Sequence, residues 1–279
     1  MIRHFVSDLD GTLLNRNFEW DKVIEDGISR VLERGYDFAV ATGRTEDGVK
    51  NCPGLWDMPV YLILMNGALI LDPKRRPVFV KEVSPETKKL FLQKYPERNL
   101  EFITASGTLT RLSQDAYIRE YSAWDMWRKK VLEKKESGYY ERFMSRISFN
   151  CTREEIQNEK ILKINGLELD DERYGRLLQE LNGCLVDAVN APFAEHVIEV
   201  TDQEVSKAKA LLWLSDYLGW KKKETAVFGD GGNDVEMLRM FPHSYAPANA
   251  VPEARAAASK VLNPDREYAV IEKIIEFIQ

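Results

Sequence analysis

Residues 2–12 read Ile-Arg-His-Phe-Val-Ser-Asp-Leu-Asp-Gly-Thr, and this stretch decides the fold. The first six residues are largely apolar and β-prone, and a polar segment follows abruptly at Asp8, which predicts a buried strand opening into a loop. Because Asp8 and Asp10 are two residues apart, their carboxylates project to the same side of an extended chain. Two buried carboxylates repel unless a cation or a proton separates them, so the pair fits a metal site, with a plain polar turn as the alternative.

Strands and helices alternate in the segment that follows. A helix is expected over residues 21–34, closed by Gly35, and strands are expected over 37–41 and 60–64. The two strands end in polar residues, which are Thr42-Gly43-Arg44 and Asn66-Gly67. This order is typical of a parallel sheet with right-handed crossovers, and open α/β sheets bind ligands at the carboxyl ends of their strands. The sequence therefore predicts an α/β fold with a Rossmann-like parallel-sheet core.

The pattern of strands followed by polar residues stops near Ser84. Strands of a more exposed sheet are expected over 102–104 and 146–149, mixed with polar helices near 115–136 and 171–181. These segments lack the pattern of a strand followed by acidic residues, so they predict an inserted α+β cap domain. The predicted boundaries are 1–82 for the first part of the core, 83–189 for the cap and 190–279 for the second part of the core.

The core pattern returns in the last third of the chain. A buried strand over 225–228 ends in Gly229-Asp230-Gly231-Gly232-Asn233-Asp234. Since neighbouring parallel strands can end at one point, the sequence predicts that three or four carboxylates among Asp8, Asp10, Asp230 and Asp234 converge there. Such a cluster is destabilising without a cation, and Mg²⁺ prefers a few carboxylates together with water and phosphate oxygens. A structural glycine-rich turn is the alternative.

Hydrogen-bond donors and a cation, which could bind an anion, occur at two further places. A hydroxyl and backbone N–H groups at Thr42-Gly43-Arg44, just before a helix, form a ready phosphate site, with a plain strand-to-helix turn as the alternative. Lys207 is expected at the start of a helix for which Ser206 is a candidate N-cap. A cation near a helix N-terminus is unfavourable for the helix dipole, and that mild misfit is typical of a functional lysine.

The charge balance bears on the class of partner. The net charge is −6 at pH 7, which weighs against nucleic-acid binding because such proteins usually carry a basic excess. The most basic stretch is Arg128-Lys129-Lys130 with Lys134-Lys135, and Glu133 and Glu136 interleave with it. A solvated helix face is the first interpretation of this stretch, and a rim that attracts anionic substrates is the second.

Cysteine usage and hydropathy bear on the cellular compartment in which the protein is expected. The three cysteines, Cys52, Cys151 and Cys184, lie far apart without metal-ligand spacing, so buried thiols in a reducing compartment are expected. No apolar run approaches the roughly 18 residues of a membrane span. Charged residues begin at Arg3, which speaks against a signal peptide. We therefore expect a cytoplasmic protein.

Four motifs, taken together, resemble those of the haloacid-dehalogenase superfamily. They are Asp8-Leu9-Asp10-Gly11-Thr12-Leu13-Leu14, Ala41-Thr42-Gly43-Arg44, Val205-Ser206-Lys207 and Gly229-Asp230-Gly231-Gly232-Asn233-Asp234-Val235-Glu236-Met237-Leu238. The chain is most similar to the Cof-type sugar-phosphate phosphatases, which carry a large cap between the second and third motifs. Asn66-Gly67-Ala68 and Asn249-Ala250 also look like turns of that subfamily, whereas Pro247 departs from its usual pattern.

The resemblance implies a Mg²⁺-dependent phosphomonoester hydrolase that acts on small phosphorylated metabolites through an aspartyl-phosphate. It implies Asp8 as the nucleophile and Asp10 as general acid and then general base. Thr42 and Lys207 would hold the transferring phosphoryl group. The implied metal ligands are the carboxylates of Asp8 and Asp230 and the backbone carbonyl of Asp10, with Asp234 orienting the outer shell. The implied substrate-binding residues are Gly43, Arg44, Asn66, Gly67 and Asn233.

Physical chemistry supports these roles independently of the resemblance. A carboxylate attacks an anionic phosphate poorly unless charge is neutralised, which Mg²⁺ and Lys207 would do. Fixed donors at Thr42 and the Gly43 amide suit the charge on the phosphoryl oxygens. The alternatives are a phosphomutase of related fold and a non-catalytic sensor of a phosphorylated ligand.

The cap is expected to act as a lid that excludes water. Its aromatic residues Trp124, Trp127, Tyr139 and Tyr140 are interpreted as cap core, with a wall against a flat substrate as the alternative. Neither a nucleic-acid partner nor a membrane is expected, and no oligomeric state is assigned.

Overall fold

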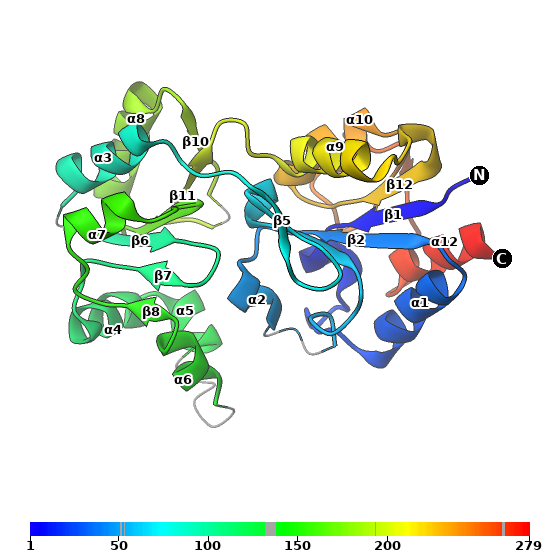
Figure 1. Ribbon diagram of the computed structural model, residues 1–279, viewed down its shortest axis with the longest axis horizontal. Coiled ribbons are helices and arrows are strands. Elements are labelled where there is room, and N and C mark those ends of the chain that lie inside the picture. The colour runs from blue at the N-terminus through cyan, green and yellow to red at the C-terminus, as the bar shows by residue number, and fades with distance from the viewer. Residues whose placement is uncertain (51, 53, 97, 132–137, 193, 264–265) are drawn as a thin grey trace. The chain divides into compact units, whose positions relative to one another are not determined.

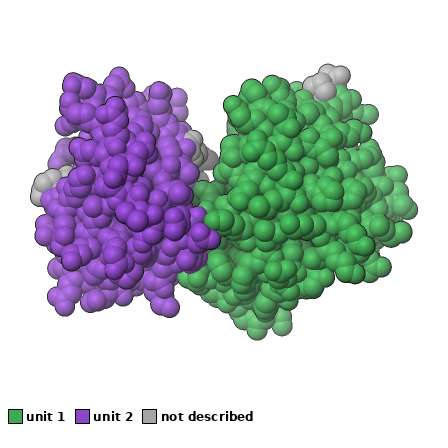
Figure 2. Space-filling model, turned by 90° about the horizontal axis from the view of Figure 1, so that it is seen from above, with its two compact units in different colours: residues 1–80, 205–279 green, residues 81–204 purple. Residues whose placement is uncertain are grey.

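The computed structural model describes residues 1–50, 52, 54–96, 98–131, 138–192, 194–263 and 266–279. The chain forms two compact units. Unit 1 consists of residues 1–80 and 205–279, and unit 2 consists of residues 81–204 (Figure 2). Unit 2 is therefore an insertion in the sequence of unit 1, as expected from the change in sequence texture near Ser84.

A mixed sheet forms the centre of unit 1. Its strands are β1 (His4–Ser7), β2 (Asp37–Ala41), β3 (Tyr61–Leu64), β4 (Leu69–Leu71), β5 (Pro77–Val80), β12 (Thr225–Phe228), β13 (His243–Ala246) and β14 (Lys260–Val261). Over the described residues the order is β14-β13-β12-β1-β2-β3-β4-β5. Neighbours from β14 to β3 pair in parallel, which confirms the predicted parallel core. The antiparallel extension by β4 and β5 was not predicted.

Helices cover both faces of this sheet (Figure 1). They are α1 (Lys22–Glu33), α2 (Glu46–Lys50), α9 (Lys207–Leu218), α10 (Val235–Met240), α11 (Pro252–Ala257) and α12 (Ala269–Ile278). Figure 1 shows α9 and α10 on one side of β1 and β2, and α1 and α12 on the other. Such double coverage explains why the central strands are apolar along their whole length instead of alternating.

Local sequence signals set the helices in place. Asp21 caps α1 by accepting hydrogen bonds from the Val23 and Ile24 backbone N–H groups. On α9 the hydrophobic face includes Leu211 and Leu214, which belong to the same core as Val6. Each fully buried side chain of this kind stabilises the fold by about 1.5–3 kcal/mol. Burial of α9 thereby fixes its N-terminus, where Lys207 lies.

Unit 2 contains a second sheet, whose order over the described residues is β10-β11-β9-β6-β7-β8. Its strands are β6 (Asn99–Ile103), β7 (Thr108–Leu109), β8 (Ile147–Ser148), β9 (Lys163–Leu167), β10 (Ala188–Asn190) and β11 (Val197–Asp202). Its helices are α3 (Pro85–Lys94), α4 (Gln114–Ser122), α5 (Asp125–Lys130), α6 (Tyr139–Met144), α7 (Arg153–Asn158) and α8 (Asp171–Cys184). The α+β character predicted for the insertion is thus present.

Several details of unit 2 differ from expectation. The second boundary lies after Glu204 and not at residue 189, because β11 pairs with β9 and β10 and so belongs to this unit. The helix expected near 115–136 is divided into α4 and α5. Lys134 and Lys135 of the basic stretch, with Glu133 and Glu136, lie outside the described residues.

The aromatic residues singled out in the insertion are mainly core. Trp127 is buried together with Tyr117 and Tyr121, and the other three pack partly buried against this cluster. The expectation of buried thiols is correct for Cys52 and wrong for Cys151 and Cys184, which are half-buried; all three are free. Among the described helices, none has the length and apolar character needed to cross a bilayer.

Candidate active site

The predicted site residues follow four neighbouring strands of unit 1. Asp8 follows β1, Asp230 follows β12 by one residue, Thr42 follows β2, and Asn66 lies in the turn after β3. The parallel register pairs Ser7 with Phe228 on one side of β1 and with Val40 on the other. The sheet therefore brings these residues to one edge, where open α/β sheets bind ligands.

The turn after Asp8 is locked against the loop that carries Asp230. Gly11 has a φ of +82°, and a Cβ atom there would lie 2.4 Å from Asp230 Oδ2. A side chain at this position is excluded by both the backbone conformation and the close approach. Next to it, Thr12 Oγ1 donates a hydrogen bond to Asp230 Oδ1 at 2.7 Å. The glycine and the threonine of the first motif thus hold two distant acidic segments together.

Lys207, the first residue of α9, contacts two of the carboxylates. Its Nζ atom lies 2.5 Å from Asp8 Oδ1 and 2.8 Å from Asp234 Oδ1, and its side chain is only 1% exposed. The cation that is unfavourable for the helix dipole is thus compensated by two carboxylates. Their charge and hydrogen bonds raise the pKa of Lys207 although its burial opposes this, so the ammonium stays protonated.

Three carboxylates meet at this point. Asp8, Asp230 and Asp234 each offer an oxygen atom, and these oxygens all lie within 4.8 Å of one another. Asp234 is fixed by its other oxygen, which accepts hydrogen bonds from the backbone N–H groups of Asp230 and Gly231. Among the described residues, nothing hydrogen-bonds to the buried Asp8 Oδ2.

Two of these carboxyl groups, Asp8 and Asp230, have raised pKa values. Burial raises the pKa of Asp8 well above its ordinary value, and Asp234 and Asp230 raise it further while Lys207 lowers it. Burial is also the main cause that raises the pKa of Asp230, and the hydrogen bond from Thr12 opposes it. Since one ammonium faces three carboxylates, the site lacks positive charge.

A divalent metal ion would supply the positive charge that these carboxylates lack. Hard cations such as Mg²⁺ bind one or two carboxylates together with water and substrate phosphate. The unpartnered oxygen of Asp8 and the neighbouring Asp230 carboxylate are oxygen donors of that kind. Asp234 also lies within the cluster, but its oxygens are already bonded to Lys207 and to backbone N–H groups.

Of the three or four carboxylates that were expected to converge, Asp10 is the one that lies elsewhere. Its side chain lies outside the acidic cluster and forms a bidentate pair with Arg44, with Nε 2.8 Å from Oδ2 and Nη2 2.5 Å from Oδ1. A planar guanidinium matches a carboxylate in this fork geometry, so Arg44 takes up both oxygens. Three of the four candidate carboxylates therefore meet, and the Asp10 side chain is held by Arg44. The ligand role of the Asp10 backbone carbonyl stays a prediction.

The phosphate-binding candidates lie in the turns after β2 and β3. Thr42 is buried, and its Oγ1 accepts a hydrogen bond from the Arg44 backbone N–H at 3.1 Å. Asn66 contacts the second and fourth motifs, because its Oδ1 accepts from Asn233 Nδ2 at 3.0 Å and lies against Gly43. The Asn66 backbone has a φ of +56°, an uncommon value for a residue other than glycine.

Gly67 has a positional requirement of its own. Its φ is +112°, and a Cβ atom there would lie 2.6 Å from the Ser206 carbonyl oxygen. The turn after β3 therefore packs directly against the start of α9, beside Lys207. This contact makes Gly67 a packing residue of the site, whereas the sequence predicted that it binds substrate, a role that stays a prediction.

Two residues of the site region were not assigned from the sequence. Thr12 holds Asp230, and Asn249 Nδ2 donates to the Gly11 carbonyl oxygen at 2.9 Å. In the same late loop, the Val251 backbone N–H donates to the Asp230 carbonyl oxygen. Thr12 and Asn249 were both visible as parts of motifs, but no local signal tells what either side chain contacts.

The fold and this constellation define an α/β protein with a parallel-sheet core and a cluster of carboxylates at the carboxyl edge of that sheet. The chain belongs to the haloacid dehalogenase-like hydrolase family, whose pattern matches residues 5–274. It is 25% identical over 258 residues to the HMP-PP phosphatase of Cronobacter sakazakii, covering 92% of this chain and 88% of that protein. It is 24% identical over 276 residues to the 5-amino-6-(5-phospho-D-ribitylamino)uracil phosphatase of Bacillus subtilis, covering 94% and 93%.

Solved structures agree on the fold. A haloacid dehalogenase-like hydrolase from B. subtilis superposes with a TM-score of 0.78 at 24% identity, covering 98% of this chain and 99% of the other. A sugar phosphatase of subclass IIB of the superfamily gives a TM-score of 0.72 at 20% identity, covering 99% and 98%. The predicted family and fold class are therefore confirmed.

Proposed function

We propose that this chain is a Mg²⁺-dependent phosphatase that hydrolyses monoesters of small phosphorylated metabolites through an aspartyl-phosphate at Asp8. The observation that carries the proposal is the state of the Asp8 carboxylate. One of its oxygens is held by Lys207, and the other is buried without a partner among the described residues, beside two further carboxylates. A buried oxygen of this kind is suited to bind a metal or to attack phosphorus.

In the first step, an Asp8 oxygen attacks the phosphorus atom of the ester and the bond from phosphorus to the leaving oxygen breaks. Asp10 gives its proton to the leaving oxygen, so that a neutral alcohol departs and Asp8 carries the phosphoryl group. The pair with Arg44 ties both Asp10 oxygens in the described state. Asp10 therefore has to leave this pair, at least in part, before it acts as an acid.

In the second step, Asp10 removes a proton from a water molecule, and the water oxygen attacks the phosphorus atom. The bond from phosphorus to Asp8 breaks, which releases inorganic phosphate and restores the carboxylate. Lys207 is positioned to neutralise charge at Asp8 throughout, because its Nζ atom contacts Asp8 Oδ1. The Asp8 and Asp230 carboxylates would hold Mg²⁺, which would supply the further positive charge that an anionic substrate requires.

The phosphoryl oxygens need fixed donors that face the nucleophile. Candidates are the Thr42 hydroxyl, the Gly43 backbone N–H and the Asn66–Asn233 pair, which follow neighbouring strands. Donors preorganised in a site of low dielectric contribute more to catalysis than donors that must reorient. The names of the two curated relatives fit this assignment, since both are called phosphatases. We also propose a cytoplasmic location, because the three cysteines are few and lie far apart in the sequence.

The experiment is a phosphate-release screen over phosphorylated metabolites with Mg²⁺, comparing the wild type with Asp8→Asn. We expect the variant to lose at least about 10⁴-fold in turnover, because nucleophile replacement removes the covalent route. Quenching the wild type in acid during turnover should leave a phosphate adduct on the peptide that contains Asp8. Asp26→Asn, an exposed aspartate of α1, is the matched control and should keep full activity.

Three results would contradict the proposal. Equal turnover by the wild type and Asp8→Asn would remove the nucleophile assignment. An isomerised ester without free phosphate would indicate a phosphomutase. Binding of phosphorylated ligands without any turnover, in a protein that is folded by circular dichroism, would indicate a sensor.

A further inference from the structure

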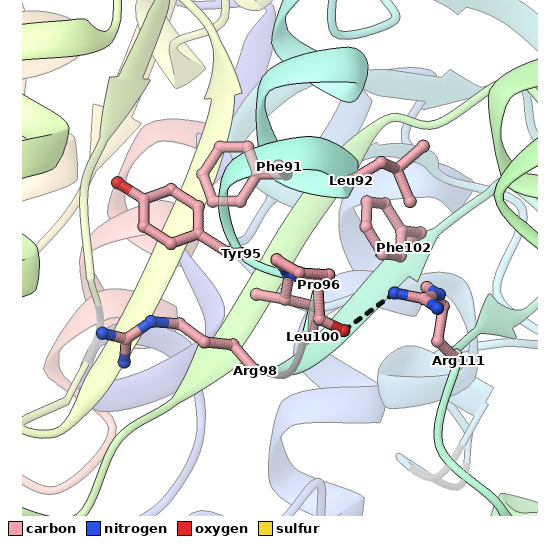
Figure 3. Close-up of a pocket in the computed structure, with 8 residues that line it drawn as sticks. All are labelled: Phe91, Leu92, Tyr95, Pro96, Arg98, Leu100, Phe102 and Arg111. Atoms are coloured by element: carbon pink, nitrogen blue, oxygen red, sulfur yellow. Dashed lines mark hydrogen bonds between the residues drawn. The ribbon is translucent and has the colours of Figure 1, made fainter.

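A small pocket lies on the apolar face of the sheet of unit 2, but it does not fit a ligand. Its lining residues are Phe91, Leu92, Tyr95, Pro96, Arg98, Leu100, Phe102 and Arg111 (Figure 3). Its two arginines are engaged, since Arg98 pairs with Glu168 and Arg111 donates to the Pro96 carbonyl oxygen. Its volume of about 10 Å³ is close to the least that one water molecule needs. In unit 1, a loop beside the acidic cluster makes contacts whose role the proposed mechanism leaves open.

The late loop, residues 247–251, joins β13 to α11 and is anchored on both sides. Because β13 pairs in parallel with β12, the late loop leaves the sheet at the same edge as Asp230. Arg255 Nη1 of α11 donates to the Ala248 carbonyl oxygen at 3.1 Å, and Ala250 is buried in the core of unit 1. The backbone of the late loop is therefore a fixed frame.

Two hydrogen bonds connect the late loop to the two acidic segments of the site. The Val251 backbone N–H donates to the Asp230 carbonyl oxygen at 2.9 Å. Asn249 Nδ2 donates to the Gly11 carbonyl oxygen, also at 2.9 Å. The first contact is available to any residue with a backbone N–H, whereas the second requires a side-chain donor of suitable length. The contact with Gly11 therefore depends on the identity of residue 249.

Stability of the fold does not account for this choice of side chain. Asn249 is exposed, and a hydrogen bond that water can replace adds little to the free energy of unfolding. Surface substitutions of this kind usually change stability only slightly. The consequence that remains is the placement of the Gly11 carbonyl.

Gly11 is the residue of the first motif whose backbone most needs a restraint. Its φ of +82° and ψ of −8° lie in the left-handed region, and glycine has more backbone freedom than any other residue. On its C-terminal side, Thr12 is held by its hydrogen bond to Asp230 Oδ1. The Asn249 amide holds the carbonyl that joins Gly11 to Thr12. The two contacts together confine a turn that a glycine alone would leave free.

The backbone of Gly11 bears on the metal site through the preceding peptide group. The carbonyl of Asp10 belongs to the planar peptide that joins Asp10 to Gly11, so its direction depends on the Gly11 φ angle. That carbonyl is a predicted ligand of Mg²⁺. The Asp10 side chain, in contrast, is fixed by Arg44. A change at Asn249 should therefore reach the Asp10 carbonyl before it reaches the Asp10 carboxylate.

We propose that Asn249 is a positioning residue of the metal site: by holding the Gly11 carbonyl, it keeps the Asp10 backbone carbonyl in place for Mg²⁺. This inference rests on the proposed Mg²⁺-dependent phosphatase function and adds a residue to it. Groups that orient metal ligands typically contribute about 10-fold to 100-fold in metal affinity. All of the residues involved belong to unit 1.

The first measurement is the dissociation constant for Mg²⁺, by titration calorimetry of the full-length, metal-stripped protein without any ester. Asn249→Ala should weaken Mg²⁺ binding by about 10-fold. Its urea transition midpoint should stay close to that of the wild type, because Asn249 is exposed. Asn249→Gln keeps an amide donor and should recover part of the affinity. Glu253→Ala, at an exposed position of α11, is the control and should bind Mg²⁺ as the wild type does.

Kinetics separate a positioning role from a merely structural one. With the best ester of the screen, the Mg²⁺ concentration that gives half-maximal turnover of Asn249→Ala should rise by the same factor of about 10. At saturating Mg²⁺ the KM for the ester should be unchanged, because the candidate phosphate donors at Thr42, Gly43 and Asn66 are untouched. A structural defect would instead lower the urea midpoint and raise KM, without a selective change in the Mg²⁺ requirement.

Hydrogen–deuterium exchange without metal tests the restraint itself. The Leu14 backbone N–H donates to the Leu9 carbonyl oxygen and closes the turn around Gly11. In Asn249→Ala the peptide that covers residues 9–14 should exchange about twofold to tenfold faster, the factor that one ordinary hydrogen bond contributes. Peptides from unit 2 should exchange as they do in the wild type.

Two results would overturn the inference and leave the proposed function intact. One is an equal Mg²⁺ dissociation constant for the wild type and Asn249→Ala. The other is weaker Mg²⁺ binding by Asn249→Ala without faster exchange in residues 9–14, which would mean that Asn249 acts by another route. If Mg²⁺ binding depends on Asn249 but no ester is hydrolysed, the proposed function falls and this inference stands. A wild type that binds no Mg²⁺ would remove both.

Discussion

Each unit of this molecule buries a lysine against carboxylates, and the two lysines differ in how they are placed. Lys207 stands at the start of a helix and bridges Asp8 and Asp234, which lie far away in sequence. Lys163 lies within a strand and pairs with Glu199 on an adjacent strand. The first arrangement leaves a carboxylate oxygen of Asp8 without a described partner, whereas in the second Lys163 Nζ lies 3.1 Å from Glu199 Oε2.

The comparison shows that burial of a charge does not by itself indicate its purpose. At Lys207 the surplus of carboxylates raises the pKa of Asp8 and Asp230, so the site is poised for a further cation. Lys163 pairs with Glu199 and also lowers the pKa of Glu101, and the neighbouring amide of Asn165 carries an unsatisfied atom. The two sites should therefore respond differently when their lysines are removed.

The largest effect is expected for Lys207→Met. Turnover should fall about 10³-fold, because the variant loses the fixed positive charge beside the nucleophile. The measurement is kcat with the best ester of the screen, with circular dichroism to verify the fold. Lys209→Met, two residues further along α9 and half-buried, should keep turnover within about twofold. A Lys207→Met enzyme with normal kcat would place this lysine in the same structural class as Lys163.

Lys163→Met should instead act on stability. The Lys163→Met change takes the ammonium away from the buried Glu199 carboxylate, and such changes cost about 3–5 kcal/mol. Urea unfolding should report this loss as a lower transition midpoint. Adding Glu199→Leu should recover much of it, because the double variant buries no charge. A single variant as stable as the wild type would show that Glu199 finds another partner or loses its charge.

Metal binding should separate the two sites further. Mg²⁺ at 100 times its dissociation constant should stabilise the metal-stripped protein by about 2.7 kcal/mol, and chelation should abolish phosphate release. Asp230→Asn should remove most of the stabilisation, whereas Glu199→Gln should leave the metal-dependent increment unchanged. Full activity in excess chelator would take Asp230 out of the metal site.

The smallest effect concerns pH and Glu101. Burial raises the pKa of this carboxyl in the folded state, so folding is favoured while it is protonated. That contribution is complete below the unfolded pKa of about 4.5 and is lost as pH rises through the higher folded value. Glu101→Gln should therefore flatten the fall in unfolding free energy from pH 4.5 toward neutrality. Equal slopes for the variant and the wild type would contradict this, and Glu172→Gln on the exposed face of α8 is the control.

Much of unit 1 was predictable because its signals are local. The apolar residues before Asp8 predict a buried strand that ends at a polar residue, and β1 covers His4–Ser7. Asp21 and Gly35 mark the helix that forms α1. The β4–β5 hairpin was missed because strands of three and four residues are too short to show a periodicity, and pairing with β3 and with each other defines them.

Unit 2 was harder to predict for a physical reason. The predicted boundary at residue 189 cut off the segment 197–202, which belongs to the insertion because it pairs in antiparallel fashion with β9 and β10. Similarly, Glu101 reads as one polar residue in an alternating strand. Its register places it opposite Asn165, which is itself opposite Glu199, and register depends on residues more than sixty positions away.

The sequence by itself determined which residue types stand at the ends of the strands, because strand and turn propensities act over a few residues. That was enough to predict the meeting of Asp8 with Asp230 and the place of Lys207 at the start of a helix. Only the tertiary structure decided that Asp10 turns away to Arg44 and that Asn249 reaches Gly11. Side-chain partners across long separations are chosen by packing and by the competition among charges, and neither is written in local sequence.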